Sequence, residues 1–194
     1  MRIGIFGGTF NPIHMGHLIT IECIRSEFAL DRVILIPARI PVHKEVACSI
    51  SAEDRLHMVK LAAEGVEWLG ISLLEIEKDA PSYTIDTVND LMKIYSGSEL
   101  FLIIGGDSFN EIGTWMRYRE LVRMIPLIVM KRHDSMEYRR DIIEMCREVS
   151  FADNPIIGIS STAVRERIRR KGSVRFHLPD RVADYIKTKG LYTN

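Results

Sequence analysis

Five short apolar runs, each long enough for a β-strand, alternate along this chain with segments whose apolar residues recur at helical spacing. Four of the runs carry few polar residues even at alternate positions, which is typical of strands buried on both faces. Regular alternation of strands and helices predicts an α/β fold, a doubly wound and mostly parallel sheet with helices on both faces. The expected strands are Arg2–Phe6, Val33–Pro37, Gly70–Leu74, Leu100–Ile104 and Leu127–Met130.

The helical segments fill the gaps between these strands and continue toward the end of the chain. Their apolar residues stand three or four positions apart, so each presents one apolar face to the sheet. No linker, repeat or low-complexity stretch interrupts them, and residues 1–194 are expected to form a single domain. The expected helices cover Leu18–Phe28, Leu56–Ala63, Ile85–Met92, Tyr138–Val149, Val164–Arg170 and Arg181–Lys187, the last capped by Gly190.

Charge and cysteine usage argue against several classes of protein. Lysine plus arginine number 26, as do aspartate plus glutamate, so no net charge steers the chain onto nucleic acid or an anionic membrane. Cys23, Cys48 and Cys146 form no Cys-x-x-Cys pair, which argues against a disulfide framework or a zinc knuckle. No apolar run approaches the roughly 20 residues of a membrane helix, and no signal peptide is recognisable. We therefore expect a cytoplasmic protein, whose oligomeric state the sequence leaves open.

The first strand runs into two glycines and then a helix, through the sequence GGTFNPIHMGH at residues 7–17. Such a turn suggests anion binding, because the unpaired N–H groups and the positive dipole end of the helix face the loop. Two well-known phosphate loops do not fit. No lysine follows a glycine, which excludes the Walker A pattern, and Gly4, Gly7 and Gly8 do not form Gly-x-Gly-x-x-Gly.

Two histidines, His14 and His17, stand three residues apart at the start of this helix. That spacing places both imidazoles on one face of the first turn, where they can cradle a triphosphate, and Gly16 leaves room for a ligand near the backbone. Two other interpretations stay open. The histidines can be satisfied core or surface residues, or part of a zinc site that lacks convincing third and fourth ligands.

The same loop resembles the histidine-bearing N-terminal motif of the nucleotidyltransferase superfamily, which is similar in turn to a motif of class I aminoacyl-tRNA synthetases. This resemblance implies a Rossmann-like fold, in which the histidines bind ATP phosphates and stabilise charge as pyrophosphate leaves. It therefore implies catalytic roles for His14 and His17. It also implies that ATP contacts Gly7, Gly8, Thr9, Phe10 and Gly16.

A second segment, GISSTAVRERI at residues 158–168, combines helix-capping residues with a cation. Ser160, Ser161 and Thr162 can cap the next helix. Arg165 then falls in its first turn, which is unfavourable beside the positive dipole end unless an anion lies between them. An arginine that extends into solvent is the alternative. The segment resembles the C-terminal ATP-phosphate motif of the superfamily, which implies a catalytic role for Arg165 and ATP contacts for the three capping residues.

The fourth expected strand, Leu100–Ile104, runs into Gly105, Gly106 and Asp107. An acid at the carboxyl end of a parallel strand lies where such sheets bind ligands, although Asp107 can equally cap the next helix. The resemblance implies that Gly105 and Asp107 contact ATP, through its ribose or a metal-bound phosphate.

Three further segments resemble the acceptor-side motifs of the bacterial nicotinate mononucleotide adenylyltransferase family: PVHK at 41–44, PSYTIDT at 81–87 and GTWMRYREL at 113–121. With the two ATP motifs, this resemblance spans nearly the whole chain. Asn11 stands where aspartate is common in the family, and Val42 where proline is common. The resemblance implies transfer of AMP from ATP, with Mg²⁺ on its phosphates, to nicotinate mononucleotide, giving deamido-NAD and pyrophosphate.

Residue chemistry supplies expected roles on the acceptor side. Trp115 offers an electron-rich face for a cationic pyridinium ring, with a core tryptophan as the alternative. A helix start supplies N–H donors for the nicotinate carboxylate, whereas a neutral amide would leave donors facing donors. These donors belong to Ser82, Tyr83 and Thr84.

His43 and Lys44 are expected to hold the acceptor's phosphate or a neighbouring loop, with a surface lysine as the alternative at position 44. Because no serine or cysteine has a base placed with it by motif, we expect direct attack without a covalent intermediate. A non-catalytic nucleotide sensor on the same sheet remains the rival function.

Overall fold

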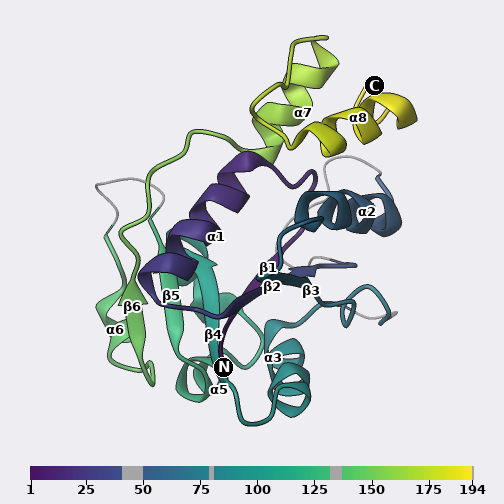
Figure 1. The fold of residues 1–194 in the computed structure, drawn as a ribbon. Helices are drawn as coiled ribbons and strands as arrows, with labels where there is room; N and C mark the ends of the chain where they lie inside the picture. The colour runs from purple at the N-terminus through teal and green to yellow at the C-terminus, as the bar shows by residue number, and fades with distance from the viewer. Residues whose placement is uncertain (41–49, 79–80, 132–136, 194) are drawn as a thin grey trace.

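The computed structural model describes residues 1–40, 50–78, 81–131 and 137–193 (Figure 1). Within these residues, six strands form one sheet in the order β3-β2-β1-β4-β5-β6, and every neighbouring pair is parallel. The prediction of a parallel α/β sheet is confirmed. The strands are β1 (Arg2–Gly8), β2 (Arg32–Pro37), β3 (Leu69–Ile71), β4 (Glu99–Gly105), β5 (Leu127–Met130) and β6 (Val149–Phe151).

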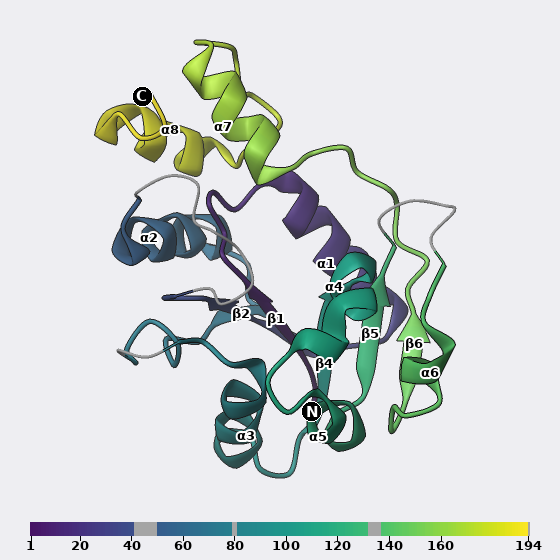
Figure 2. The same ribbon diagram turned by 180° about the vertical axis from the view of Figure 1, so that it is seen from behind.

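Helices cover both faces of the sheet, as Figures 1 and 2 show from opposite sides. One face packs against α1 (Met15–Glu27), α2 (Ala52–Ala63), α7 (Ser161–Arg169) and α8 (Asp180–Lys189). The other packs against α3 (Thr84–Ile94), α4 (Gly106–Glu111), α5 (Tyr118–Met124) and α6 (Arg140–Ile143), with a 3₁₀ turn at Ile112–Thr114. None of the helices in the described residues is long and apolar enough to cross a membrane.

Strand β2 explains why the apolar runs lack polar alternation. Val33 and Leu35 belong to the core under α1 and α2, whereas Ile34 and Ile36 belong to the core under α3. Successive side chains of a strand point to opposite faces, so a strand covered on both faces must be apolar at every position.

Part of the predicted element pattern is wrong near the sheet edge. The expected helix Tyr138–Val149 shrinks to the single turn of α6, and β6 follows it as a short strand that pairs with β5. Val149 and Phe151 favour extended backbone, but a strand of three residues is too short to show a recognisable hydrophobic pattern. A helix after Asp107 was expected without bounds, and α4 begins beside it, at Gly106; neither α4 nor α5 was given a predicted range, because they span only six and seven residues.

The third strand also ends earlier than expected, at Ile71 rather than Leu74. Beyond it, the Ser72 hydroxyl accepts a hydrogen bond of 3.4 Å from the Leu74 N–H, so the backbone turns locally and leaves the sheet. The predicted cap of the last helix is confirmed, because Gly190 adopts the left-handed conformation with φ of 61°.

The strand order fixes where a ligand can bind. The chain builds β1, β2 and β3 outward in one direction and then β4, β5 and β6 in the other, so the order reverses between β1 and β4. In doubly wound sheets, the crevice at the carboxyl ends of such strands is the usual binding site. Gly4 permits the close packing of this central pair, because a Cβ there would lie 2.7 Å from Cδ1 of Ile103.

Candidate active site

A cleft of about 690 Å³ opens at the carboxyl ends of β1 and β4, where the strand order reverses. Its walls come from the loop after β1, the starts of α1, α3, α4 and α7, and the segment that carries Trp115. Fifteen of the sequence-predicted site residues line it: Gly7, Gly8, Thr9, Phe10, His14, His17, Ser82, Thr84, Gly105, Asp107, Trp115, Ser160, Ser161, Thr162 and Arg165.

Two other predicted residues, Gly16 and Tyr83, do not line this cleft. A Cβ at Gly16 would lie 3.1 Å from Nδ1 of His14 and 3.3 Å from the Ile159 carbonyl oxygen, so this glycine makes room for the protein's own groups. Tyr83 packs partly buried against the core beside α3. His43 and Lys44 lie outside the described residues.

The two histidines form one compact unit at the start of α1. Their rings are stacked, with centroids 3.6 Å apart and planes 19° from parallel. His14 is buried, and its Nδ1 accepts a hydrogen bond of 3.3 Å from the His17 N–H, while Nδ1 of His17 accepts one of 3.3 Å from the His14 N–H. This reciprocal arrangement is a capping box made of two imidazoles. Since both Nδ1 atoms accept, each neutral ring carries its proton on Nε2.

The loop between β1 and α1 has an irregular backbone that distant residues hold in place. Phe10 is buried in the left-handed region with φ of 46°, and the Asn11–Pro12 peptide is cis. Ser161 donates a hydrogen bond of 2.9 Å to the Pro12 carbonyl oxygen, and the Met15 N–H donates one of 2.8 Å to the carbonyl oxygen of His177. The C-terminal third of the chain therefore fixes the loop that carries the histidines.

Arg165 joins the two predicted ATP motifs directly. Its Nη1 donates a hydrogen bond of 2.9 Å to the Asn11 carbonyl oxygen, and its Nη2 donates one of 3.2 Å to Oγ1 of Thr162. The half-buried guanidinium thus points back across the cleft toward the histidine loop and does not extend into solvent. Among the three expected caps, Ser160 alone caps α7, by accepting from the Ala163 N–H at 3.2 Å.

Asp107 lies in the first turn of α4, with its side chain on the cleft. The N-cap of that helix is Gly105, without a side-chain hydrogen bond, so Asp107 does not act as the cap. An exposed carboxylate at the carboxyl end of the central strand remains available to a ligand hydroxyl or a metal ion.

Glu75 is a cleft residue that the sequence pattern did not reveal. It is 9% exposed and lines the cleft together with Ser82 and Thr84 at the start of α3. Its Oε1 accepts a hydrogen bond of 2.7 Å from the Thr87 hydroxyl. Burial raises the pKa of this carboxyl, which outweighs the opposing effect of the Thr87 hydrogen bond. A carboxyl group therefore stands beside the helix start that was expected to bind a carboxylate.

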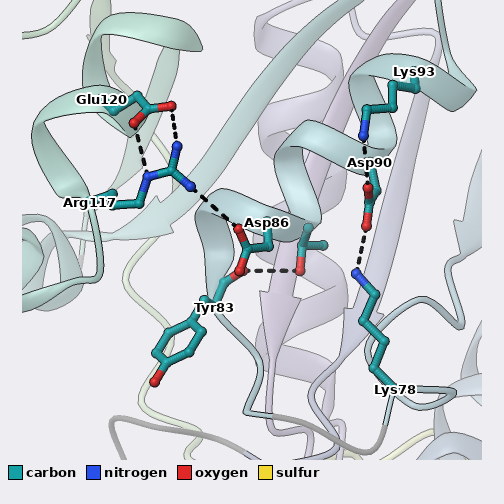
Figure 3. Close-up of polar contacts among 8 residues, drawn as sticks. Lys78, Tyr83, Asp86, Asp90, Lys93, Arg117 and Glu120 are labelled. Atoms are coloured by element: carbon teal, nitrogen blue, oxygen red, sulfur yellow. Dashed lines mark hydrogen bonds and ion pairs between the residues drawn. The ribbon is translucent and has the colours of Figure 1, made fainter.

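The two described segments that were predicted to bind the acceptor, residues 81–87 and 113–121, are also joined to each other. Arg117 adopts a left-handed backbone, with φ of 53°, at the start of α5. Figure 3 shows its guanidinium between Asp86 of α3, at 3.7 Å, and Glu120 of α5, at 2.6 Å. All three side chains are about half exposed, so these ion pairs align the segments rather than add much stability.

Arg55 and Tyr192 are buried polar partners of the histidine loop that the sequence analysis missed. Arg55 donates from Nη1 to the Thr9 carbonyl oxygen at 2.7 Å, and Tyr192 donates its hydroxyl proton to Oδ1 of Asn11 at 2.6 Å. One signal for Arg55 was present in the sequence. It stands four and seven positions before Val59 and Ala62, on the buried face of α2.

Metal-binding groups are sparse in the described residues, where no cluster of three or more histidine, cysteine, aspartate or glutamate side chains could hold an ion. For the described part of the chain, the zinc alternative for His14 and His17 therefore gains no further ligand. The two rings instead face a cleft lined by hydroxyl groups, glycines and Arg165.

Comparison with known proteins agrees with this architecture. Residues 5–167 match the model of the cytidylyltransferase-like family. A protein of Desulfitobacterium hafniense named "probable nicotinate-nucleotide adenylyltransferase" is 40% identical over 98% of this chain and 95% of its own. Its namesake from Caldicellulosiruptor saccharolyticus is 40% identical, with 99% of each chain covered.

Solved structures of low sequence identity share the fold. The nicotinic acid mononucleotide adenylyltransferase of Plasmodium falciparum, complexed with NaAD, has a TM-score of 0.81 at 17% identity, over 98% of this chain and 97% of its own. Since the family model covers most of the chain and the named relatives cover nearly all of it, this protein belongs to the cytidylyltransferase-like family and, within it, to the nicotinate-nucleotide adenylyltransferases.

Proposed function

We propose that this protein transfers AMP from ATP to nicotinate mononucleotide, giving deamido-NAD and pyrophosphate. The observation that carries the proposal is the stacked pair of His14 and His17 in one cleft with Arg165 and with the start of α3. Full-length relatives bear the name of this activity, and a solved structure of the same fold was obtained with NaAD.

ATP is proposed to lie along the loop of residues 7–17 and the start of α7. Backbone N–H groups at residues 7–10, the Nε2–H groups of the two imidazoles and the hydroxyl groups of Ser160 and Thr162 offer donors to phosphate oxygens. The Ser161 hydroxyl already donates to the Pro12 carbonyl oxygen, so Ser161 would contribute its backbone N–H at the start of α7. Arg165 adds a fixed positive charge with a planar fork of donors. Gly105 and Asp107 are proposed to contact the nucleoside or a metal-bound phosphate.

The reaction needs positioning and charge stabilisation more than proton transfer. The acceptor phosphate is already ionised, so it can attack the α-phosphorus of ATP in line without a general base, forming the new P–O bond as the bond to pyrophosphate breaks. Negative charge then grows on the bridging oxygen. We assign its stabilisation to His14, His17 and Arg165, which converge on the cleft from two helices.

Nicotinate mononucleotide is proposed to occupy the wall formed by the start of α3 and Trp115. The N–H groups of Tyr83 and Thr84 would bind the pyridine carboxylate, and the indole would stack on the cationic ring. The Ser82 N–H is already donated to the Ile40 carbonyl oxygen at 3.3 Å, so Ser82 would contribute its hydroxyl group instead. The roles predicted for His43 and Lys44, toward the acceptor phosphate, remain part of this proposal.

Mg²⁺ is proposed to enter with ATP. The chemistry of the cleft fits such an ion, because hydroxyl groups and one exposed carboxylate, Asp107, line it, and Mg²⁺ prefers oxygen ligands. Phosphate oxygens would supply most of its ligands, as Mg²⁺ commonly takes one or two carboxylates plus substrate phosphates. When bound, the ion neutralises charge on the triphosphate.

A cytoplasmic location, without nucleic acid or membrane partners, completes the proposal. Cys23 and Cys146 carry free thiols, which are stable in a reducing compartment. The chain's zero net charge agrees with small-molecule substrates bound by local groups.

The test is pyrophosphate release from ATP by the purified protein with Mg²⁺, comparing three acceptors. We expect rapid release with nicotinate mononucleotide, much slower release with nicotinamide mononucleotide, and none with phosphopantetheine. Equal use of acid and amide would preserve the chemistry but contradict the carboxylate site at α3. Failure with all three acceptors, while ATP still binds, would contradict the enzyme and favour a nucleotide sensor.

A further inference from the structure

We propose that Arg55 is a positioning residue of this active site. Its buried guanidinium fixes the histidine loop to the end of β2 and, through Arg39, to the acceptor wall. The inference rests on the proposed function, because it concerns how the two substrate sites are held in register.

Arg55 bonds to backbone at the ends of two parallel strands. It projects from the first turns of α2 and is 2% exposed. Its Nη1 donates a hydrogen bond of 2.7 Å to the Thr9 carbonyl oxygen, just beyond β1, and its Nη2 donates one of 3.0 Å to the Arg39 carbonyl oxygen, just beyond β2. The guanidinium fork therefore connects the two segments that follow β1 and β2.

These bonds continue the pairing of β1 with β2 past the point where the ladder stops. The final ladder contact is the Ala38 N–H, which donates to the Gly8 carbonyl oxygen at 3.0 Å. Beyond it, Phe10 turns into the left-handed region. Thr9 lines the cleft directly after this last contact, so the Arg55 fork sets the direction in which the histidine loop leaves the sheet.

The contact extends to the acceptor side through Arg39. The Nη1 of Arg39 donates a hydrogen bond of 2.8 Å to the carbonyl oxygen of Ile76. Ile76 follows Glu75, which lines the cleft and accepts from Thr87 in the first turn of α3. A continuous set of hydrogen bonds thus runs from the histidine loop, through Arg55 and the end of β2, to the nicotinate side.

Stability alone gives no reason for a cation at this position. Within the described residues both hydrogen-bond acceptors of Arg55 are carbonyl oxygens, and its buried Nε has no hydrogen-bond partner. The favourable effects of Tyr192 and Glu53 on its charge are smaller than the cost of burial. Burial lowers the pKa of this guanidinium, which reflects the cost of removing the charge from water. Apolar side chains of similar volume often replace buried ionic groups with little loss of stability, or with a gain, because burying a charge is costly. The rigid fork instead suits a task of alignment.

The test compares Arg55→Met, Arg55→Lys and the exposed control Lys60→Met on the same helix. We expect kcat/KM for ATP to fall about 10- to 100-fold in Arg55→Met, because small misplacements of reacting groups have effects of that size. Its melting temperature should stay within about 4 °C of the wild type, since loss of two hydrogen bonds and relief of charge burial oppose each other. Arg55→Lys should recover part of the rate, and Lys60→Met should match the wild type.

A second readout needs no substrate and no activity. Hydrogen–deuterium exchange of the peptide covering residues 9–17 should be faster in Arg55→Met than in the wild type, with exchange in β4 and β5 unchanged. The proposal is overturned if Arg55→Met keeps wild-type kinetics, or if both Arg55 variants lose activity only in proportion to the folded fraction. A wild-type protein without transferase activity would contradict the proposed function, whereas the exchange experiment would still test the Arg55 contact.

Discussion

The Tyr192 hydroxyl donates a hydrogen bond of 2.6 Å to Oδ1 of Asn11, and each residue is only 6% exposed. This bond joins two residues that lie 181 positions apart in the chain. It ties the C-terminal segment after α8 to the loop that carries both histidines. The neutral amide oxygen of Asn11 accepts this hydrogen bond without placing a charge at the buried position.

Removing this phenol should destabilise the protein. Tyr192→Phe leaves Oδ1 of Asn11 buried without its donor, which costs about 1–3 kcal/mol. Tyr185→Phe is the matched control, because its hydroxyl bonds to Asp54, a partly exposed carboxylate that water and Ser51 can still satisfy. Urea denaturation should give a clearly smaller loss for Tyr185→Phe than for Tyr192→Phe. Equal losses would contradict the role given to the Asn11 bond.

The contrast between the histidines and Tyr192 marks what the sequence could predict. His14 and His17 are three residues apart at a strand-to-helix turn, so local periodicity alone places them on one face. The partners of their loop come from the ends of distant elements, as Tyr192 and Arg55 do, and no local pattern connects such residues. Burial of Arg55 was the most predictable of these contacts from sequence, since Arg55 shares one face of its helix with the apolar residues Val59 and Ala62.

The same physical limit applies to the fold. Strands covered on both faces, such as β2, carry a continuous apolar signal that identifies them directly. The edge strand β6 has three residues, of which Val149 and Ser150 are only partly buried and Phe151 is exposed, so its pattern is weak. Its place is determined by pairing with β5, a tertiary contact that the sequence does not display.

Arg165 should matter for rate far more than for folding. Arg165→Ala removes a cation and a donor fork from the cleft, and we expect kcat to fall about 100- to 1,000-fold, the usual effect of deleting one preorganised donor to the transition state. Arg165→Lys keeps the charge but loses the fork, so its rate should lie between those of the wild type and Arg165→Ala.

The control for Arg165 is Arg170, the C-cap residue of the same helix. Arg170 is paired with Glu166 four residues earlier, and its side chain is 77% exposed. Arg170→Ala should retain the wild-type rate, as expected for an exposed i, i+4 ion pair. Steady-state kinetics at saturating substrates check both variants. A similar loss in both would indicate a general effect of positive charge and not the placement of Arg165.

The buried carboxyl of Glu75 should give the folding stability a distinctive pH dependence. Burial raises its pKa in the folded protein above the ordinary value of 4.5. Between the unfolded and folded pKa values, the folded state binds more protons, so this group's contribution to stability falls as pH rises. Glu75→Gln has no such charge and still accepts the Thr87 hydrogen bond. Its stability relative to the wild type should therefore increase from about pH 4 upward and then level off.

Asp54 supplies the control of opposite sign. The Tyr185 hydrogen bond lowers its pKa, so its stabilising contribution is present at neutral pH and is lost as pH falls through the folded pKa. Urea denaturation over a pH series should show Asp54→Asn less stable than the wild type at neutral pH, with the difference shrinking in acid. A stability difference for Glu75→Gln that does not vary with pH would contradict the assignment of a buried, titrating carboxyl.

Trp115 allows binding of the pyridine ring to be followed by fluorescence, because the chain has only one other tryptophan. Trp68 lies beside Arg25, whose guanidinium is 5.0 Å from the centre of its ring, and it does not line the cleft. Nicotinate mononucleotide should quench the emission of Trp68→Phe, where Trp115 is the remaining tryptophan, and leave that of Trp115→Phe nearly unchanged.

Trp115→Ala should raise KM for the mononucleotide about 2- to 30-fold, the range expected from a lost cation–π contact, without changing KM for ATP. Quenching that persists in Trp115→Phe would place the pyridine ring elsewhere, and an equal rise in both KM values would make Trp115 a structural residue of the wall.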